Sequence, residues 1–199
     1  TPRSMYHQLA DRVATDNVPW SQVEVYLGDE RDVPHDDVES NFGMAQRALL
    51  DHVPIDWSRV YPMRADTQDI DAAAREYEQT VRDLVPAGPE GIPQFDLIML
   101  GLGGDGHVAS LFPNTESLDE WERLVVACHV PVLGRNRMTF TFPLINAARN
   151  ILLLVTGDDK AEAVERIFQK GDTTLPAARV SPQHGTIHVV LDTGAARLV

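Results

Sequence analysis

Residues 95–107 read FDLIMLGLGGDGH, an almost continuously apolar run that leads into a glycine-rich loop and a histidine. An apolar run without alternation is typical of a parallel strand that is buried on both faces. In α/β domains such strands alternate with helices, and ligands bind beyond the carboxyl ends of the strands. We therefore expect the loop at 101–107 to lie at the rim of a sheet, where a ligand binds.

Strands and helices are expected to alternate on both sides of this loop. The patterns predict strands at 23–27, near 60, and at 124–127, 138–142, 150–155 and 187–191. They predict helices at 1–13, at 40–52, at 69–84 and after Asp159. This alternation indicates one α/β domain over residues 1–199 with a parallel or mixed sheet. Three polar segments follow strands and should meet at one rim: 28–31, 101–107 and 156–160.

Composition excludes several classes of protein. Thirty acidic against 17 basic side chains give a formal net charge of −13, which argues against nucleic acid and against an anionic membrane surface as partners. The longest apolar runs are far shorter than the roughly 18 residues of a membrane span. Cys128 is the single cysteine, so it forms neither an internal disulfide nor a thiolate metal site. We expect a cytoplasmic protein without metal or cofactor.

The glycine loop has three interpretations. Gly101, Gly103 and Gly106 satisfy G-x-G-x-x-G, but Pro113 interrupts the helix that a dinucleotide site needs. A P-loop is also disfavoured, because His107 stands where the phosphate-binding lysine belongs. The third interpretation is a backbone cradle for an anion that carries a catalytic histidine. With an ordinary pKa of about 6.5, a histidine suits proton transfer near neutral pH.

Basic side chains near the ends of predicted elements are candidates for binding an anion. They are Arg31, Arg137 and Lys160. Lys160 is expected in the first turn of a helix, where a cation opposes the helix dipole. An unfavourable local choice of this kind points to function. Ser110 lacks the context of a nucleophile elbow, and we interpret it as structural.

Several segments together resemble one family. Residues 28–31 (GDER), with Val33-Pro34 and Ser40-Asn41, resemble the G-D-E-R-x-V-P…S-N signature of 6-phosphogluconolactonases. Residues 101–113 (GLGGDGHVASLFP) are similar to the most specific motif of that family. Arg137 in RMTFTFP and residues 157–164 (GDDKAEAV) resemble two further segments. The resemblance covers essentially the whole chain in order.

The resemblance implies a three-layer αβα fold with a mostly parallel, Rossmann-like sheet, known as the NagB-like fold. It implies hydrolysis of 6-phospho-D-glucono-1,5-lactone to 6-phosphogluconate in the oxidative branch of the pentose phosphate pathway, with no cofactor. His107 is then the expected general base. The side chain that orients it is left open among Asp105, Asp29 and Glu30. The expected substrate-binding residues are Thr1, Arg31, Gly103, Gly104, Arg137 and Lys160.

Family members carry a strand, a helix and a second strand before the position of Thr1, so the resemblance implies a chain that is incomplete at its N-terminus. Two other functions remain open. One is a glucosamine-6-phosphate isomerase or deaminase, which shares the D-G-H loop but has a catalytic carboxylate where residues 110–113 (SLFP) have none. The other is a non-catalytic domain that senses sugar phosphates. The oligomeric state is open, with a monomer preferred.

Overall fold

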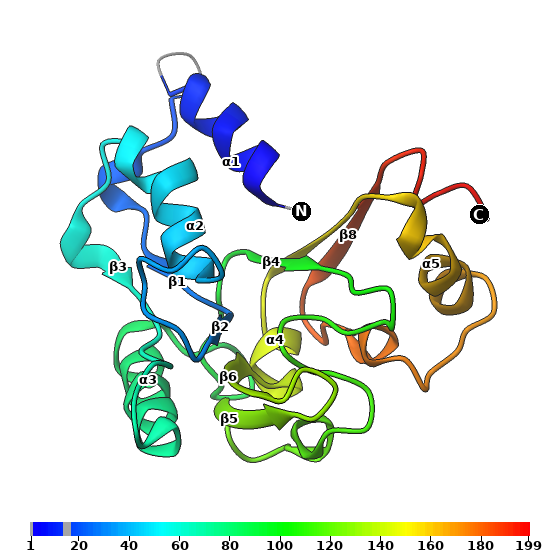
Figure 1. The fold of residues 1–199 in the computed structure, drawn as a ribbon. Helices are drawn as coiled ribbons and strands as arrows, with labels where there is room; N and C mark the ends of the chain where they lie inside the picture. Colours follow the sequence, from blue (N-terminus) through cyan, green and yellow to red (C-terminus); the bar gives the residue numbers. More distant parts are fainter. Residues whose placement is uncertain (1, 14–16) are drawn as a thin grey trace.

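The computed structural model describes residues 2–13 and 17–199, along which helices and strands alternate (Figure 1). The α-helices are α1 (Pro2–Asp11), α2 (Asn41–Ala48), α3 (Ile70–Leu84), α4 (Phe142–Asn146) and α5 (Ala161–Phe168). The strands are β1 (Val25–Tyr26), β2 (Asp29–Arg31), β3 (Val60–Tyr61), β4 (Ile98–Gly101), β5 (Val125–Val130), β6 (Arg135–Phe140), β7 (Asn150–Val155) and β8 (Thr186–Leu191). Short 3-10 helices are η1 (Trp20–Gln22), η2 (Leu50–His52), η3 (Trp57–Arg59), η4 (Glu116–Asp119), η5 (Asp158–Lys160) and η6 (Pro176–Arg179). The α/β class is confirmed.

Hydrogen bonding divides the described strands among three sheets. β4, β7 and β8 form a parallel sheet in that order, and β1 pairs in parallel with β3. β2, β6 and β5 form an antiparallel sheet. A tight turn closes the β5–β6 hairpin, with the Gly134 N–H donating to the Pro131 carbonyl at 3.1 Å. The expectation of a polar loop at 28–31 was therefore wrong for residues 29–31, because β2 pairs with the free edge of this hairpin.

Two buried clusters fill the interior. The larger combines residues of α3, β4, α4, β7 and α5 with residues of the β5–β6 hairpin. The smaller lies between α1, α2 and the 3-10 helices near them, and includes Trp20 and Phe42. Leu27 packs against both clusters. Its N–H donates to the hydroxyl of Tyr77 in α3 at 2.8 Å, which ties the segment between β1 and β2 to the larger core.

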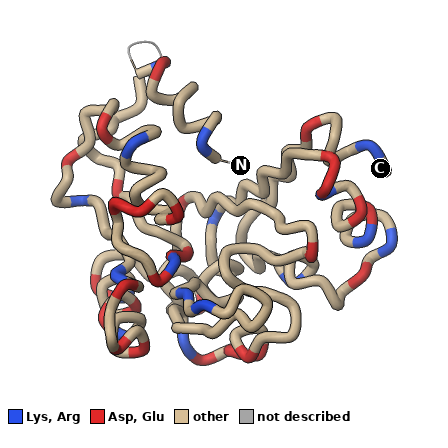
Figure 2. Tube along the Cα trace, viewed as in Figure 1, with Lys and Arg blue, Asp and Glu red and all other residues tan. Residues whose placement is uncertain are grey.

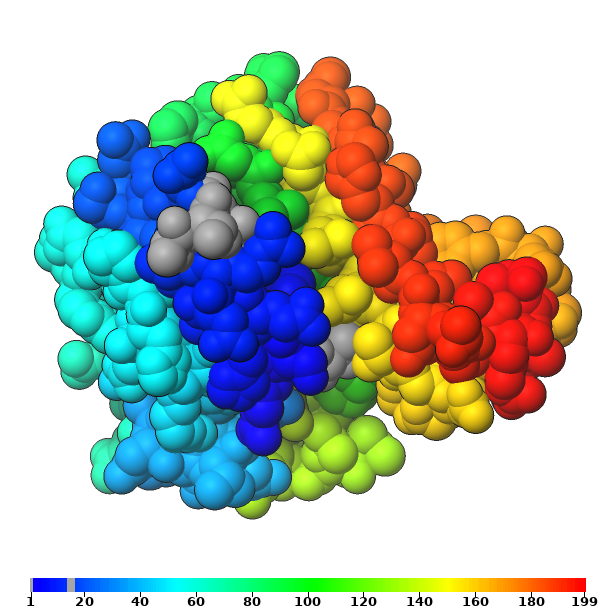
Figure 3. Space-filling view, turned by 90° about the horizontal axis from the view of Figure 1, so that it is seen from above, coloured from blue at the N-terminus to red at the C-terminus, as the bar shows by residue number. Residues whose placement is uncertain are grey.

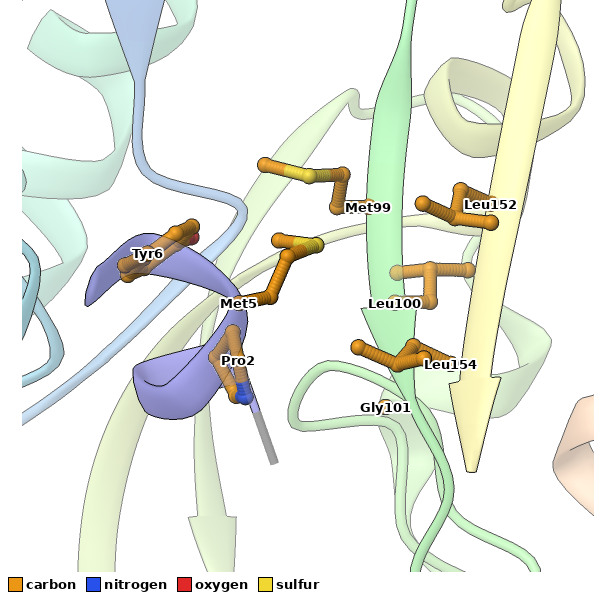
Figure 4. A pocket seen from close by; sticks show the side chains of 8 residues that line it. All are labelled: Pro2, Met5, Tyr6, Met99, Leu100, Gly101, Leu152 and Leu154. Carbon is orange, nitrogen blue, oxygen red and sulfur yellow. The ribbon is translucent and has the colours of Figure 1, made fainter. Parts of the chain in front are cut away.

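β4 is not buried on both faces, as the sequence predicted. Ile98 and Leu100 are buried, but Met99 is 41% exposed and Gly101 is exposed. Met99 shares a small apolar pocket with Met5 of α1 and with side chains of β7 (Figure 4). Figure 3 shows α1 lying along the surface beside the green and yellow segments of the chain. The reason for the difference is that, among the described residues, α1 covers this face of the sheet only in part.

Charged residues are distributed over the whole trace, with acidic and basic side chains interspersed (Figure 2). Many are paired at the surface, as in the contact of Arg59 with Glu24 at 2.9 Å. Within residues 2–13 and 17–199, none of the helices has the length and apolar character needed to cross a membrane.

Candidate active site

The glycine loop begins where β4 ends and folds back on itself. The Gly103 N–H donates to the His107 carbonyl at 2.9 Å, and the Gly106 N–H donates to the Gly103 carbonyl at 3.0 Å. Gly106 has a φ of +83°, a conformation that favours glycine. A Cβ at Gly103 would overlap Nδ1 and Cε1 of the His107 imidazole. Gly103 thus leaves the space into which the imidazole fits.

Asp105 holds the imidazole of His107 from one side. Its Oδ1 lies 2.6 Å from His107 Nδ1 and 3.2 Å from the His107 backbone nitrogen. In the neutral imidazole, Nδ1 then carries the proton that it donates to the carboxylate, and Nε2 is left as an acceptor. The His107 side chain is 29% exposed. The side chain is therefore partly open to solvent, and in this tautomer Nε2 is the ring nitrogen that can accept a proton.

Lys160 lies next to the glycine loop. It ends η5 and directly precedes α5, close to the predicted position in a first helical turn. A Cβ at Gly104 would be 3.9 Å from Lys160 Nζ. The ammonium also contacts the carboxylate of Asp159 at 2.7 Å. The segments at 101–107 and 156–160, expected to converge from the sequence, are thus in contact.

Asp29, in β2, is bonded to the segment that follows the glycine loop. Its Oδ2 accepts a hydrogen bond from Ser110 Oγ at 2.7 Å, and its Oδ1 accepts one from Asn41 Nδ2 at 3.0 Å. The backbone N–H of Ser110 donates to Thr139 Oγ1 at 3.1 Å. Ser110 is fully buried, so it does not act as a nucleophile. Sequence analysis missed that this serine, three residues after the glycine loop, connects the segment after the loop to the antiparallel sheet.

Arg31 and Arg137 lie side by side on β2 and β6, where they are register partners. Arg137 was expected at the end of an element but lies within β6. Burial lowers the pKa of Arg137, and the nearby positive charge of Arg31 lowers it further. The Nε atoms of both arginines are buried and find no hydrogen-bond partner among the described residues. Two adjacent guanidinium groups with unused donors form a site suited to an anion.

Glu30 has a different setting from the one expected of a catalytic carboxylate. Its side chain is 0% exposed. Its two oxygens accept hydrogen bonds at 2.8–2.9 Å from four donors: the backbone N–H groups of Arg31, Asn41 and Phe42 and the hydroxyl of Ser40. These contacts satisfy the free N–H groups at the start of α2. We therefore place Glu30 among the supporting residues and not among the groups that reach a substrate.

Phe112 is a second residue that sequence analysis missed. Its ring centroid is 3.9 Å from that of His107, with 23° between the planes. The guanidinium carbon of Arg137 lies 5.9 Å from the same centroid. The described structure thus brings His107 and Arg137 to one aromatic ring. The only available signal was that Phe112 follows the glycine loop closely in sequence.

Two features lie outside this cluster. Thr1, a predicted contributor to the phosphate site, lies outside the described residues. The pocket between α1 and the parallel sheet is lined by apolar side chains and Tyr6, with Gly101 at one end. None of the predicted site residues that the structure describes lines that pocket, so we do not take it as the candidate active site.

Comparison with known proteins assigns the family. The sequence profile described as glucosamine-6-phosphate isomerases/6-phosphogluconolactonase matches residues 1–189. A 6-phosphogluconolactonase of Streptomyces coelicolor is 40% identical over 195 residues, which cover 94% of this chain and 74% of that protein. A 6-phosphogluconolactonase of Mycobacterium tuberculosis is 40% identical over 187 residues, with 91% and 75% covered. The chain thus spans about three quarters of each of these relatives.

Solved structures share the fold. The 6-phosphogluconolactonase of Trypanosoma brucei matches with a TM-score of 0.84 at 28% identity, covering 98% of this chain and 81% of that one. A monomeric glucosamine-6-phosphate deaminase, described as a missing link of the NagB superfamily, matches with a TM-score of 0.81 at 26% identity, covering 100% and 84%. The predicted NagB-like fold is confirmed. This chain belongs to the family of glucosamine-6-phosphate isomerases and 6-phosphogluconolactonases.

Proposed function

We propose that this chain hydrolyses 6-phospho-D-glucono-1,5-lactone to 6-phosphogluconate, the activity that gives its relatives in Streptomyces and Mycobacterium their names. The observation that carries the proposal is the contact of one aromatic ring, Phe112, with both an imidazole and a guanidinium. It brings a base and a cationic group together in one site. A phosphorylated substrate of this kind also favours the cytoplasm as the location.

His107 is the general base in this proposal. A lactone is an activated ester, so attack by water needs neither a metal nor a covalent intermediate. Nε2 of His107 takes a proton from a water molecule whose oxygen adds to the C1 carbonyl. When the tetrahedral intermediate collapses, the bond from C1 to the ring oxygen breaks, and the imidazolium returns the proton to that oxygen. Asp105, 2.6 Å from Nδ1, stabilises the imidazolium between these steps.

The cationic groups bind two different negative groups, the 6-phosphate and the oxyanion that forms at C1. Arg137 and Lys160 bind the 6-phosphate, where arginine offers a planar fork and lysine a compact charge. Arg31 stabilises the oxyanion that develops at C1. The Gly103 N–H is already bonded to the His107 carbonyl. Within the described residues, the Gly104 N–H makes no such backbone bond, so it can donate to the oxyanion.

Asp29 is a supporting carboxylate in this scheme. Its oxygens are held by Ser110 and Asn41, whereas the imidazole is already bonded to Asp105. This arrangement favours Asp105 as the residue that orients His107. The negative charge of Asp29 raises the pKa of Arg137 and so offsets part of the repulsion from Arg31.

The proposal is tested with lactone prepared immediately before use. Formation of 6-phosphogluconate is followed through a coupled dehydrogenase reaction, at a pH where spontaneous ring opening is slow. The rate above the spontaneous background should increase in proportion to protein concentration. A parallel assay measures ammonia released from glucosamine 6-phosphate. Ammonia release without lactone hydrolysis would replace the proposal by a deaminase, and no turnover of either substrate would overturn it.

A further inference from the structure

Phe112 makes contacts that a purely structural core residue does not need. Its ring is stacked on the imidazole of His107 at a centroid distance of 3.9 Å. The guanidinium carbon of Arg137 lies 5.9 Å from the ring centroid, within the range of a cation–π interaction. Phe112 itself is buried. Its ring is therefore a fixed surface against which two polar groups of the site rest.

Asp105 alone does not set the plane of the imidazole. The Asp105 side chain is 45% exposed, so its carboxylate can move together with Nδ1, and the hydrogen bond leaves a range of χ2 angles open to the imidazole. Rotamer preference gives little help, because χ2 of histidine is broad and roughly two-fold. A Cβ at Gly103 would overlap Nδ1 and Cε1, so this glycine lies along that edge of the ring. The flat face of Phe112 is what restricts the remaining rotation, and with it the direction in which Nε2 points.

The sequence builds this stack with a tight turn. The Leu111 N–H donates to the Val108 carbonyl at 2.9 Å, and Ala109 has a φ of +48°. A positive φ is uncommon for a residue with a side chain, so the reversal at 108–111 is held by its surroundings. The turn returns the chain to the imidazole five residues after His107. Thr115 Oγ1 donates to the Phe112 carbonyl at 2.7 Å and holds the far side of the segment.

We propose that Phe112 is a positioning residue that sets the plane of the His107 imidazole. This inference rests on the proposed lactone hydrolysis, in which Nε2 must point at a water molecule. The phenyl ring of Phe112 has no group that takes or donates a proton. Its effect comes from orientation, since a catalytic group that is misaligned with its target loses much of its rate enhancement.

The kinetic test compares three substitutions at buried phenylalanines. Phe112→Leu keeps an apolar side chain but removes the flat face, so kcat should fall roughly tenfold, with a smaller change in KM. Phe112→Tyr keeps the ring and should retain most of kcat. Phe142→Leu is the matched control, because Phe142 is fully buried and stacks on Trp121 and not on His107. Its kcat should stay near that of the parent protein at a temperature where both are folded. Equal kcat losses in the two Phe112 variants, or none in either, would overturn the inference.

A spectroscopic test needs no substrate. Stacking on a phenyl ring shifts the carbon-bound imidazole protons of His107 upfield, and the bond to Asp105 keeps the neutral ring protonated at Nδ1. Both signatures should be present in NMR spectra of the parent protein and weaker in Phe112→Leu. If that variant does not fold, the parent spectrum still decides: absence of the upfield shift contradicts the stack. The NMR result stands apart from turnover, so loss of the proposed function and loss of this inference are distinguishable.

Discussion

Arg31 and Arg137 are direct register partners in the antiparallel pairing of β2 with β6. Like charges opposite each other on one pair of strands are unfavourable. Burial lowers the pKa of Arg137, and the charge of Arg31 lowers it further. In the proposed function, the substrate phosphate at Arg137 and the oxyanion at Arg31 would relieve this repulsion.

Arg137→Ala should mainly weaken substrate binding. The loss of a charge-assisted hydrogen bond corresponds to roughly a 10–100-fold increase in KM, with a smaller effect on kcat. Arg149→Ala is the control, because Arg149 is an exposed arginine whose Nε lies 3.2 Å from Asp96 Oδ1. Steady-state kinetics of both variants check the assignment. A KM in Arg137→Ala equal to that of the parent would exclude Arg137 from the phosphate site.

His107→Ala should reduce kcat while KM changes little. A general base contributes on the order of 10²–10⁴-fold to the rate. His184→Ala is the matched control, since His184 is exposed and its Nε2 is 3.6 Å from Glu90 Oε1. Rates are measured above the spontaneous hydrolysis of the lactone. If kcat survives the change at position 107, a different residue activates the water.

Glu30→Gln should destabilise the protein without abolishing catalysis. In the parent protein, the donors around position 30 meet carboxylate oxygens at 2.8–2.9 Å. The amide of glutamine would place an N–H₂ group against some of these donors. The expected cost is about 2 kcal/mol of unfolding free energy, measured by denaturant titration. In protein that is still folded, kcat should stay close to the parent value. An unchanged unfolding free energy combined with a large loss of kcat would return Glu30 to the catalytic candidates.

Glu78 should make stability depend on acidic pH. Burial opposes its ionisation, but hydrogen bonds from Arg123 and Arg82, at 2.6–3.0 Å, outweigh burial and hold its pKa below the ordinary value of 4.5. A group whose pKa is lowered in the folded state stabilises the protein at pH values above its ordinary pKa. This contribution is lost as the pH falls through the lowered pKa.

The test follows the midpoint of thermal unfolding, Tm, from pH 7 to pH 3. Glu78→Gln should lower Tm at pH 7, and its Tm should fall less steeply below pH 4.5 than that of the parent. Glu76→Gln, at an exposed position of the same helix, should leave the slope unchanged. Identical slopes in the parent and Glu78→Gln would show that Glu78 does not contribute to the loss of stability in acid.

Cys128 should react slowly in the folded protein. Burial raises the pKa of its thiol to about 11, and the nearby charge of Asp29 adds to the effect. Because the thiolate is the reactive form, alkylation at pH 8 should be roughly 100-fold slower than for a cysteine at the ordinary pKa of 9.0. Labelling with iodoacetamide in buffer and in urea measures the difference. Equally fast labelling in both would contradict burial of the thiol.

Much of the fold followed from local patterns. Consecutive residues were enough to predict the apolar runs of β4 and β7, the amphipathic pattern of α3 and the loop at 101–107. The antiparallel sheet was not predicted, since β2 has three residues and becomes a strand only by pairing with β6. The exposed face of β4, which carries Met99 and Gly101, was also missed, because an apolar run shows that a segment avoids water but not what covers it.

The same division holds for the site. The sequence alone determined which groups are available: an imidazole two residues after a carboxylate, a loop of glycines, and a few cations on an acidic chain. Tertiary structure decided which groups meet. It enclosed Glu30 under α2, set Arg31 beside Arg137, and turned the ring of Phe112 onto His107. These contacts join residues from separate elements or depend on the path of a turn, and local sequence preference carries no information about such long-range geometry.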